Sequence, residues 1–222
     1  MDPRPVSTMT VPALGALVVV AAATWVLVVV GRRRYRNRLV HWATRHGFAY
    51  RPWDDRLTWL TNGYPFNCGT EDGRHVFVGR RRGRHVIFGE YQGKRGRSLS
   101  KYQLVGIELA AECPYLDVSQ KTVRSRLSTV FGARGLQLDS PDFNDHFTID
   151  TTADRFAGDV LSLTVMDWLL HDERGRALPW RIQGDWLMTW RYGTLDTTDV
   201  LGYLRFLHDL FDQLPDHLWR KE

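Results

Sequence analysis

One uncharged stretch constrains the fold of this chain more than any other feature. Residues 11–30 contain no charged side chain and consist mostly of Leu, Val and Ala. At 1.5 Å per residue, a helix over these residues rises about 30 Å, which matches the thickness of a bilayer's hydrocarbon core. The pattern therefore predicts a transmembrane helix over residues 11–30, preceded by a short external N-terminus at residues 1–10.

A cleaved signal peptide is the competing interpretation, with Ala21, Ala22 and Ala23 as the small-residue cleavage site. The apolar run continues past these alanines from Trp25 to Val30, however, and arginines follow directly. A buried core helix is disfavoured because it would normally carry a polar stripe. We therefore expect an uncleaved anchor.

Basic residues flank the apolar stretch unevenly. Only Arg4 precedes it, offset by Asp2, whereas arginines dominate the segment that follows. The positive-inside rule then predicts an external N-terminus and a cytoplasmic C-terminal side, in a single-pass protein of the plasma (inner) membrane. Anionic phospholipid headgroups of that membrane would attract the arginines. The five arginines in this run are Arg32, Arg33, Arg34, Arg36 and Arg38.

Helical periodicity continues beyond the apolar stretch. Four residues recur at spacings of four, three and four, namely Tyr35, Leu39, Trp42 and His46. Gly47 is then typical of the residue that ends a helix. The sequence predicts a basic, juxtamembrane helical stalk over residues 31–47 and one cytoplasmic domain over residues 48–222.

Strand and turn signals dominate the start of that domain. The segment Gly73–Gly79 is echoed by Gly83–Gly89, with three arginines between the two copies. Two β-rich segments joined by a short, Gly-containing turn predict a β-hairpin with a basic tip.

Strands and helices then follow in mixed order. The patterns predict strands over residues 102–110 and 116–118, a short helix over 120–131, a second hairpin from 177–182 and 186–191, and a final helix between Asp196 and Pro215. This order predicts an α+β fold with a largely antiparallel sheet and a C-terminal packing helix.

Charge is distributed unevenly between the two halves of the chain. Residues 31–101 carry 17 Lys and Arg against 5 Asp and Glu, whereas residues 102–222 carry 12 against 19. This asymmetry favours an anionic surface facing the first half, and phospholipid headgroups rank above nucleic acid there. The simpler interpretation is a solvated, arginine-rich tip. Besides the run after the apolar stretch, the candidate contacts are Arg80, Arg81, Arg82, Arg84, Lys94, Arg95 and Arg97.

Motifs that would indicate chemistry are absent. The sequence has no G-x-S-x-G, H-E-x-x-H, phosphate-binding loop or G-x-G-x-x-G pattern, and no C-x-x-C pair. His208 and Asp212 lie one helical turn apart, but zinc needs three or four ligands. The segment from Asp142 to His146 is better explained as a turn than as a metal cluster. We therefore predict no catalytic, metal or cofactor-binding residue.

Four segments carry a resemblance to known sequences. They are residues 138–147, residues 165–170, residues 180–184 and the pair Leu187-x-x-Trp190. Through them the chain resembles an uncharacterised family of actinobacterial single-pass membrane-anchored proteins, and is similar to a broader bacterial domain of unknown function. The resemblance covers roughly residues 32–220. It implies a compact domain with an anchor, and it supplies no activity.

Together these patterns favour a membrane-anchored, cytoplasm-facing module without enzymatic activity, which binds a protein partner or the lipid surface at the inner leaflet. The alternative is a hydrolase-like enzyme whose site is assembled from scattered residues. A deep pocket with converging polar groups would favour that alternative.

Overall fold

The structure, a computed structural model, describes residues 10–61, 63, 65–66, 70–95, 98–121 and 136–219. The chain divides into two compact units, Met1–His46 and Gly47–Glu222, which are considered separately below. The short helix predicted over residues 120–131 lies almost entirely outside the described residues. Cys68 is also outside them.

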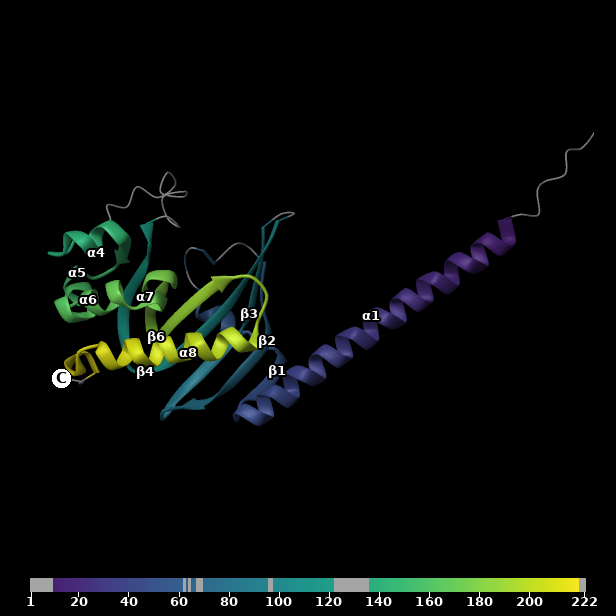
Figure 1. The fold of residues 1–222 in the computed structure, drawn as a ribbon, viewed down its shortest axis with the longest axis horizontal. Helices are drawn as coiled ribbons and strands as arrows, with labels where there is room; N and C mark the ends of the chain where they lie inside the picture. Colours follow the sequence, from purple (N-terminus) through teal and green to yellow (C-terminus); the bar gives the residue numbers. More distant parts are fainter. Residues whose placement is uncertain are drawn as a thin grey trace, which may run out of the picture. The chain divides into compact units, whose positions relative to one another are not determined.

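The first unit contains one long helix, α1, which spans Thr10–His46 (Figure 1). Gly47 follows it with φ of 75°, in the left-handed region that residues other than glycine rarely adopt. The extent of α1 and its end before Gly47 therefore confirm that the helix continues beyond the apolar stretch, as predicted.

The prediction of a membrane-spanning segment is wrong for this structure. Among the described residues, no helix is both long and apolar enough to cross a membrane. The transmembrane helix over residues 11–30 and the single-pass location at the plasma membrane are therefore not retained.

The second unit is built around one antiparallel sheet of six strands. These are β1 (Ala49–Trp53), β2 (Thr70–Arg81), β3 (Arg84–Arg95), β4 (Ser98–Gln120), β5 (Phe147–Thr151) and β6 (Trp180–Tyr192). Neighbouring strands follow the order β1-β2-β3-β4-β5, and β6 also pairs with β4. The long strand β4 holds β3 and β5 at different parts of its length, while β6 runs beside both parts.

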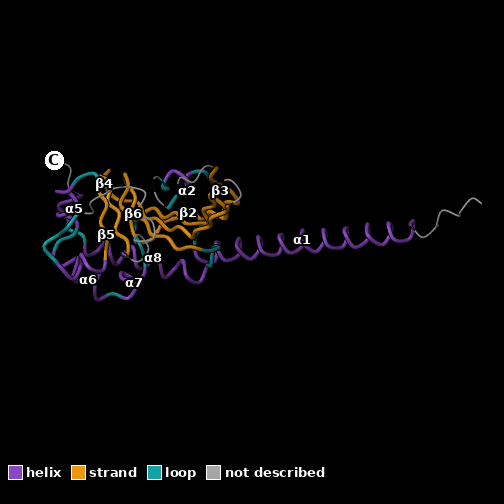
Figure 2. Tube along the Cα trace, turned by 90° about the horizontal axis from the view of Figure 1, so that it is seen from above, coloured by secondary structure: helices purple, strands orange, loops and turns teal. Residues whose placement is uncertain are grey.

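Helices cover both faces of the sheet. They are α2 (Arg56–Trp59), α4 (Pro141–His146), α5 (Asp154–Val160), α6 (Leu163–His171), α7 (Glu173–Ala177), α8 (Thr197–Gln213) and the 3-10 turn η1 (Asp216–Trp219). Figure 2 shows α2 on one side of the sheet and α6, α7 and α8 on the other. This mixed helical and antiparallel fold confirms the α+β prediction.

Each face of the sheet has its own apolar core. On the α2 face the buried cluster is Leu57, Leu60, Phe66, Val76, Ile87, Tyr91, Leu104, Met188 and Trp190. Because side chains alternate along a strand, Val105, Ile107 and Leu187 point to the α8 face, and all three are fully buried. These apolar residues all belong to the second unit.

The first hairpin forms as the repeat predicts. Arg81 pairs with Arg84, and the two residues between them, Arg82 and Gly83, have φ of 45° and 77°. Positive φ at both central residues is typical of the two-residue turn whose backbone twist matches that of the two strands of a hairpin.

The last helix also forms where its pattern predicts. The Asp196 side chain accepts a hydrogen bond from the backbone N–H of Thr198 at 2.8 Å, and α8 ends at Gln213, two residues before Pro215. Val200, Leu204 and Leu207 on its apolar face are buried.

The second predicted hairpin is wrong. Residues 180–192 form the single strand β6, and Gly184, with φ of 59°, lies where its pairing with β4 changes register. The strands predicted over residues 102–110 and 116–118 likewise belong to one strand, β4. Irregular pairing around Cys113 lets both strands bend without ending.

Candidate functional site

The arginines after the apolar stretch lie along α1 within the first unit. The side chains of Arg32, Arg33, Arg34, Arg36 and Arg38 are all exposed. The helix contains no Asp or Glu, so no carboxylate on α1 neutralises them. The guanidinium carbon of Arg38 lies 5.8 Å from the centroid of the Tyr35 ring. This run is a concentrated, locally uncompensated positive surface.

The basic hairpin tip of the second unit is different, because α8 engages it. Arg82 Nη1 lies 3.1 Å from Asp212 Oδ2 and 3.6 Å from Asp209 Oδ1. The guanidinium carbon of Arg84 lies 3.6 Å from the centroid of the Phe211 ring. Two of the tip arginines therefore connect the hairpin to the helix.

The remaining candidate contacts have mixed placements. Arg81 lies over the Phe48 ring at 5.1 Å. Arg80 is exposed on β2, opposite His85. The backbone of Lys94 and Arg95 belongs to β3, while the side chains of both and the whole of Arg97 lie outside the described part.

Some of the positive charge in the first half of the chain is therefore neutralised by acidic residues of the second half. Asp209 accepts from Arg174 at 2.9 Å as well as facing Arg82, so acids of α8 receive cations from both halves of the sequence. His208 is buried beside them. Burial, and then the nearby Arg82 charge, hold the pKa of His208 below its usual value.

Metal binding finds no support in the described ranges, where no group of three or more His, Cys, Asp and Glu side chains could hold an ion. Ser140 caps α4 by accepting from the Phe143 backbone N–H, and His146 Nδ1 lies 2.9 Å from the Asp142 carbonyl. The Asp142–His146 segment is thus a capped helical turn.

A buried ion pair escaped prediction from sequence. Arg181 of β6 is fully buried and lies 2.8 Å from Asp117 of β4. Its guanidinium carbon also lies 4.9 Å from the ring centroid of Trp190 and 5.7 Å from that of Phe66. The two partners are 64 residues apart, so only knowledge of the β4–β6 register could have paired them.

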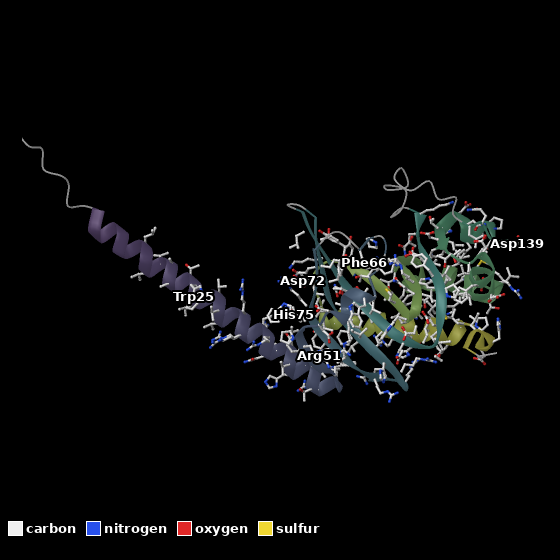
Figure 3. The ribbon with its side chains drawn as sticks, turned by 180° about the vertical axis from the view of Figure 1, so that it is seen from behind. Trp25, Arg51, Phe66, Asp72, His75 and Asp139 are labelled. Carbon is white, nitrogen blue, oxygen red and sulfur yellow. The ribbon has the colours of Figure 1, made fainter. Side chains whose placement is uncertain are left out.

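A second surface of indoles and guanidinium groups lies at the β1 end of the sheet. We define the indole–arginine patch as Arg51, Trp53, Arg56 and Trp59. Between them, Asp54 accepts from Arg51 at 2.8 Å and from Arg56 at 2.7 Å. The Arg56 side chain is the main reason that the pKa of Asp54 falls to about 2. Figure 3 views the molecule from behind and labels Arg51 and Phe66.

Comparison with known proteins bears on the fold. No family model matches the chain, and no curated protein matches it. One solved structure does match, the crystal structure of the mycobacterial trehalose monomycolate transport factor A, TtfA. Its TM-score is 0.56 at 17% sequence identity, over 81% of this chain and 95% of that chain. At this identity the likeness shows a fold shared with a bacterial protein. The narrower resemblance to an actinobacterial family of membrane-anchored proteins is not shown.

Proposed function

We propose that this chain is a non-enzymatic module that binds anionic phospholipid headgroups through the arginine run of α1. The observation that carries the proposal is the exposure of Arg32, Arg33, Arg34, Arg36 and Arg38 on a helix without any carboxylate. Guanidinium groups suit phosphate because they present several N–H donors in a plane and remain charged.

The expected attraction is substantial but sensitive to salt. Each arginine near an anionic lipid surface contributes about 1 kcal/mol, and the attraction decays within a Debye length of about 8 Å at physiological ionic strength. Five such residues within two turns of helix concentrate positive charge around one short section of α1. Binding through this run should therefore weaken steeply as salt is added.

The hairpin arginines have a smaller part in this proposal. Arg82 and Arg84 are engaged by α8, so a lipid would have to compete with contacts that already exist. Arg80 is exposed and better placed to add to the attraction. Lys94, Arg95 and Arg97 remain candidate contacts on the basis of their charge alone.

The shared fold gives independent support for a lipid-related role. The matched protein is described as a transport factor for trehalose monomycolate, which is a glycolipid. No described observation favours the enzyme alternative over a binding role. A protein partner also remains compatible with the fold, but the charge of α1 favours lipid.

Sedimentation of the purified full chain with vesicles tests the proposal. We expect the chain to sediment with phosphatidylglycerol-containing vesicles and to be released by added salt. Replacing Arg32, Arg33 and Arg34 with Gln should weaken that binding by about a hundredfold, because three contributions of about 1 kcal/mol are lost.

A matched variant controls for the loss of net charge. Arg155, Arg176 and Arg205 are exposed arginines on α5, α7 and α8, and replacing them with Gln removes the same number of charges elsewhere. That variant should bind as the unmodified chain does. Equal losses in the two triple variants, or equal sedimentation with phosphatidylcholine vesicles, would refute the proposal.

A further inference from the structure

We infer that the indole–arginine patch is a second lipid contact, through which the domain of residues 47–222 inserts two indoles into a phospholipid interface. The inference rests on the proposed function for the choice of partner. It concerns a different unit of the chain and a different physical interaction, so each can fail without the other.

The two indoles are exceptionally exposed for their size. Trp53 retains 69% and Trp59 74% of the accessible surface of a free residue. Buried Trp side chains each remove a large apolar area from water, so two exposed indoles leave a considerable favourable transfer unrealised. The other apolar side chains of α2 and the residue after it, Leu57 and Leu60, are buried in the core.

Local geometry gathers the patch onto one surface. Arg51 and Trp53 are two residues apart on β1 and therefore face the same side of the strand. Arg56 and Trp59 are three apart on α2 and lie on one side of its single turn. Asp54 contacts both arginines and joins the two pairs.

The support beneath the patch is closely packed. The backbone N–H of Asp54 donates to the Gly73 carbonyl at 3.2 Å. A Cβ at Gly73 would lie 2.4 Å from the Asp54 carbonyl oxygen and 3.0 Å from Leu57 Cβ. The indoles are thus presented on a segment already fixed against β2, and little ordering remains to oppose binding.

Guanidinium chemistry selects phosphate as the polar part of the partner. Arg51 donates to Asp54 from Nη1, while Arg56 donates from Nε and Nη2, so each retains N–H donors for an acceptor. Their side chains are 50% and 44% exposed, whereas that of Asp54 is only 7% exposed. The shared carboxylate lies beneath the two cations and leaves them at the surface.

The composition of the indole–arginine patch suits the surface of a lipid bilayer better than it suits an apolar groove on a partner protein. Asp54 and Asp55 balance the two arginines in formal charge, so long-range attraction is not the driving force. The exposed large apolar side chains of β1 and α2 are both indoles, whose amphipathic rings favour the headgroup level of a bilayer. Indole insertion should consequently resist salt, unlike binding through α1.

Quenching by brominated lipid tests this inference on the full chain. The probe is a vesicle of phosphatidylglycerol and brominated phosphatidylcholine, and the reporter is tryptophan fluorescence. We compare the unmodified chain with a variant carrying Trp53→Phe and Trp59→Phe, which keeps two aromatic rings. The fluorescence of these two residues, obtained as the difference, should be quenched, because bromine atoms would lie next to the inserted indoles.

Polar replacements test the contribution to affinity. Trp53→Ser with Trp59→Ser should weaken vesicle binding about tenfold or more, because two apolar side chains lose their burial. Leu163 on α6 is also 70% exposed, and Leu163→Ser should leave binding unchanged.

The outcomes separate the two proposals. Salt-sensitive sedimentation without quenching of Trp53 and Trp59 would overturn this inference and leave the proposed function standing. The same would follow if the serine variant bound normally. Quenching that persists in the Arg32, Arg33 and Arg34 glutamine variant at saturating vesicle concentration would support the patch, while an unchanged vesicle affinity of that variant would contradict the proposed role of α1.

Discussion

Arg181 of β6 donates to Asp117 Oδ2 of β4 from both Nε, at 3.0 Å, and Nη2, at 2.8 Å. Both side chains are buried, and the Trp190 ring flanks the guanidinium group. The pair joins the two longest strands at cross-strand positions. The guanidinium group of Arg181 is a full positive charge in the interior of the domain. Such a charge is stable there only when an oppositely charged group lies beside it.

Removing one partner of this pair should be costly. Asp117→Leu removes the carboxylate that lies against the buried guanidinium group of Arg181, and we expect it to lower the free energy of unfolding by about 3–5 kcal/mol. Combining Asp117→Leu with Arg181→Met removes both charges and should recover much of that loss. Urea unfolding followed by circular dichroism measures both. A loss below about 1 kcal/mol for the single variant would contradict a structural role for the pair.

Asp54 should make stability depend on pH in the acid range. The pKa of Asp54 is about 2 in the folded chain, against 3.8 ordinarily, because Arg56 and Arg51 stabilise its carboxylate. A lowered folded pKa gives stability that is complete above pH 4 and is lost as the pH falls toward 2. The urea midpoint of Asp54→Asn should therefore lie below that of the unmodified chain at pH 5 and converge with it near pH 2. A constant difference across this range would show that the carboxylate charge is not responsible.

The two hairpin arginines that contact α8 should differ in importance. Arg84 lies against the Phe211 ring and donates to the Glu108 carbonyl at 3.3 Å, whereas the side chain of Arg82 is 56% exposed. Arg84→Gln should cost about 1–2 kcal/mol of unfolding free energy through the lost cation–π contact. Arg82→Gln should cost at most about 1 kcal/mol, because exposed ion pairs contribute little. The opposite ranking in urea unfolding would contradict the engaged position of Arg84.

Two glycines should respond oppositely to alanine. Gly73→Ala places a Cβ 2.4 Å from the Asp54 carbonyl oxygen, so the backbone has to shift. We expect this shift to lower the free energy of unfolding by about 1–3 kcal/mol. Gly202 lies inside α8 with nothing within 4 Å of the added atom, and Gly202→Ala should stabilise by about 1 kcal/mol. Thermal unfolding measures both. Stabilisation by Gly73→Ala would mean that β2 and the segment before α2 do not approach so closely.

Local signals of the sequence predicted part of the fold. The repeated Gly-Arg-His segments predicted the first hairpin, and Asp196 predicted the start of α8, because turn and capping chemistry act over only a few residues. Gln183-Gly184-Asp185 had the same turn-like composition but lies within β6. Pairing along β4 overrides the local preference there, and the result is an irregularity in the strand.

Features that depend on distant residues could not be predicted. The excess of positive charge in the first half suggested an external anionic surface, yet Arg82 contacts Asp209 and Asp212 of the same chain. The pairing of Arg181 with Asp117 also depends on the sheet register. The apolar composition before Arg32 suggested a membrane span, which the described helix does not confirm.

Salt dependence of vesicle affinity tests the proposed function most directly. The affinity of the full chain for phosphatidylglycerol-containing vesicles is measured at several salt concentrations, together with the variant in which Arg32, Arg33 and Arg34 are Gln. The proposed role of α1 predicts that affinity falls steeply with salt for the unmodified chain and much less steeply for the variant. Equal salt dependence in the two proteins would contradict headgroup binding by the arginine run of α1.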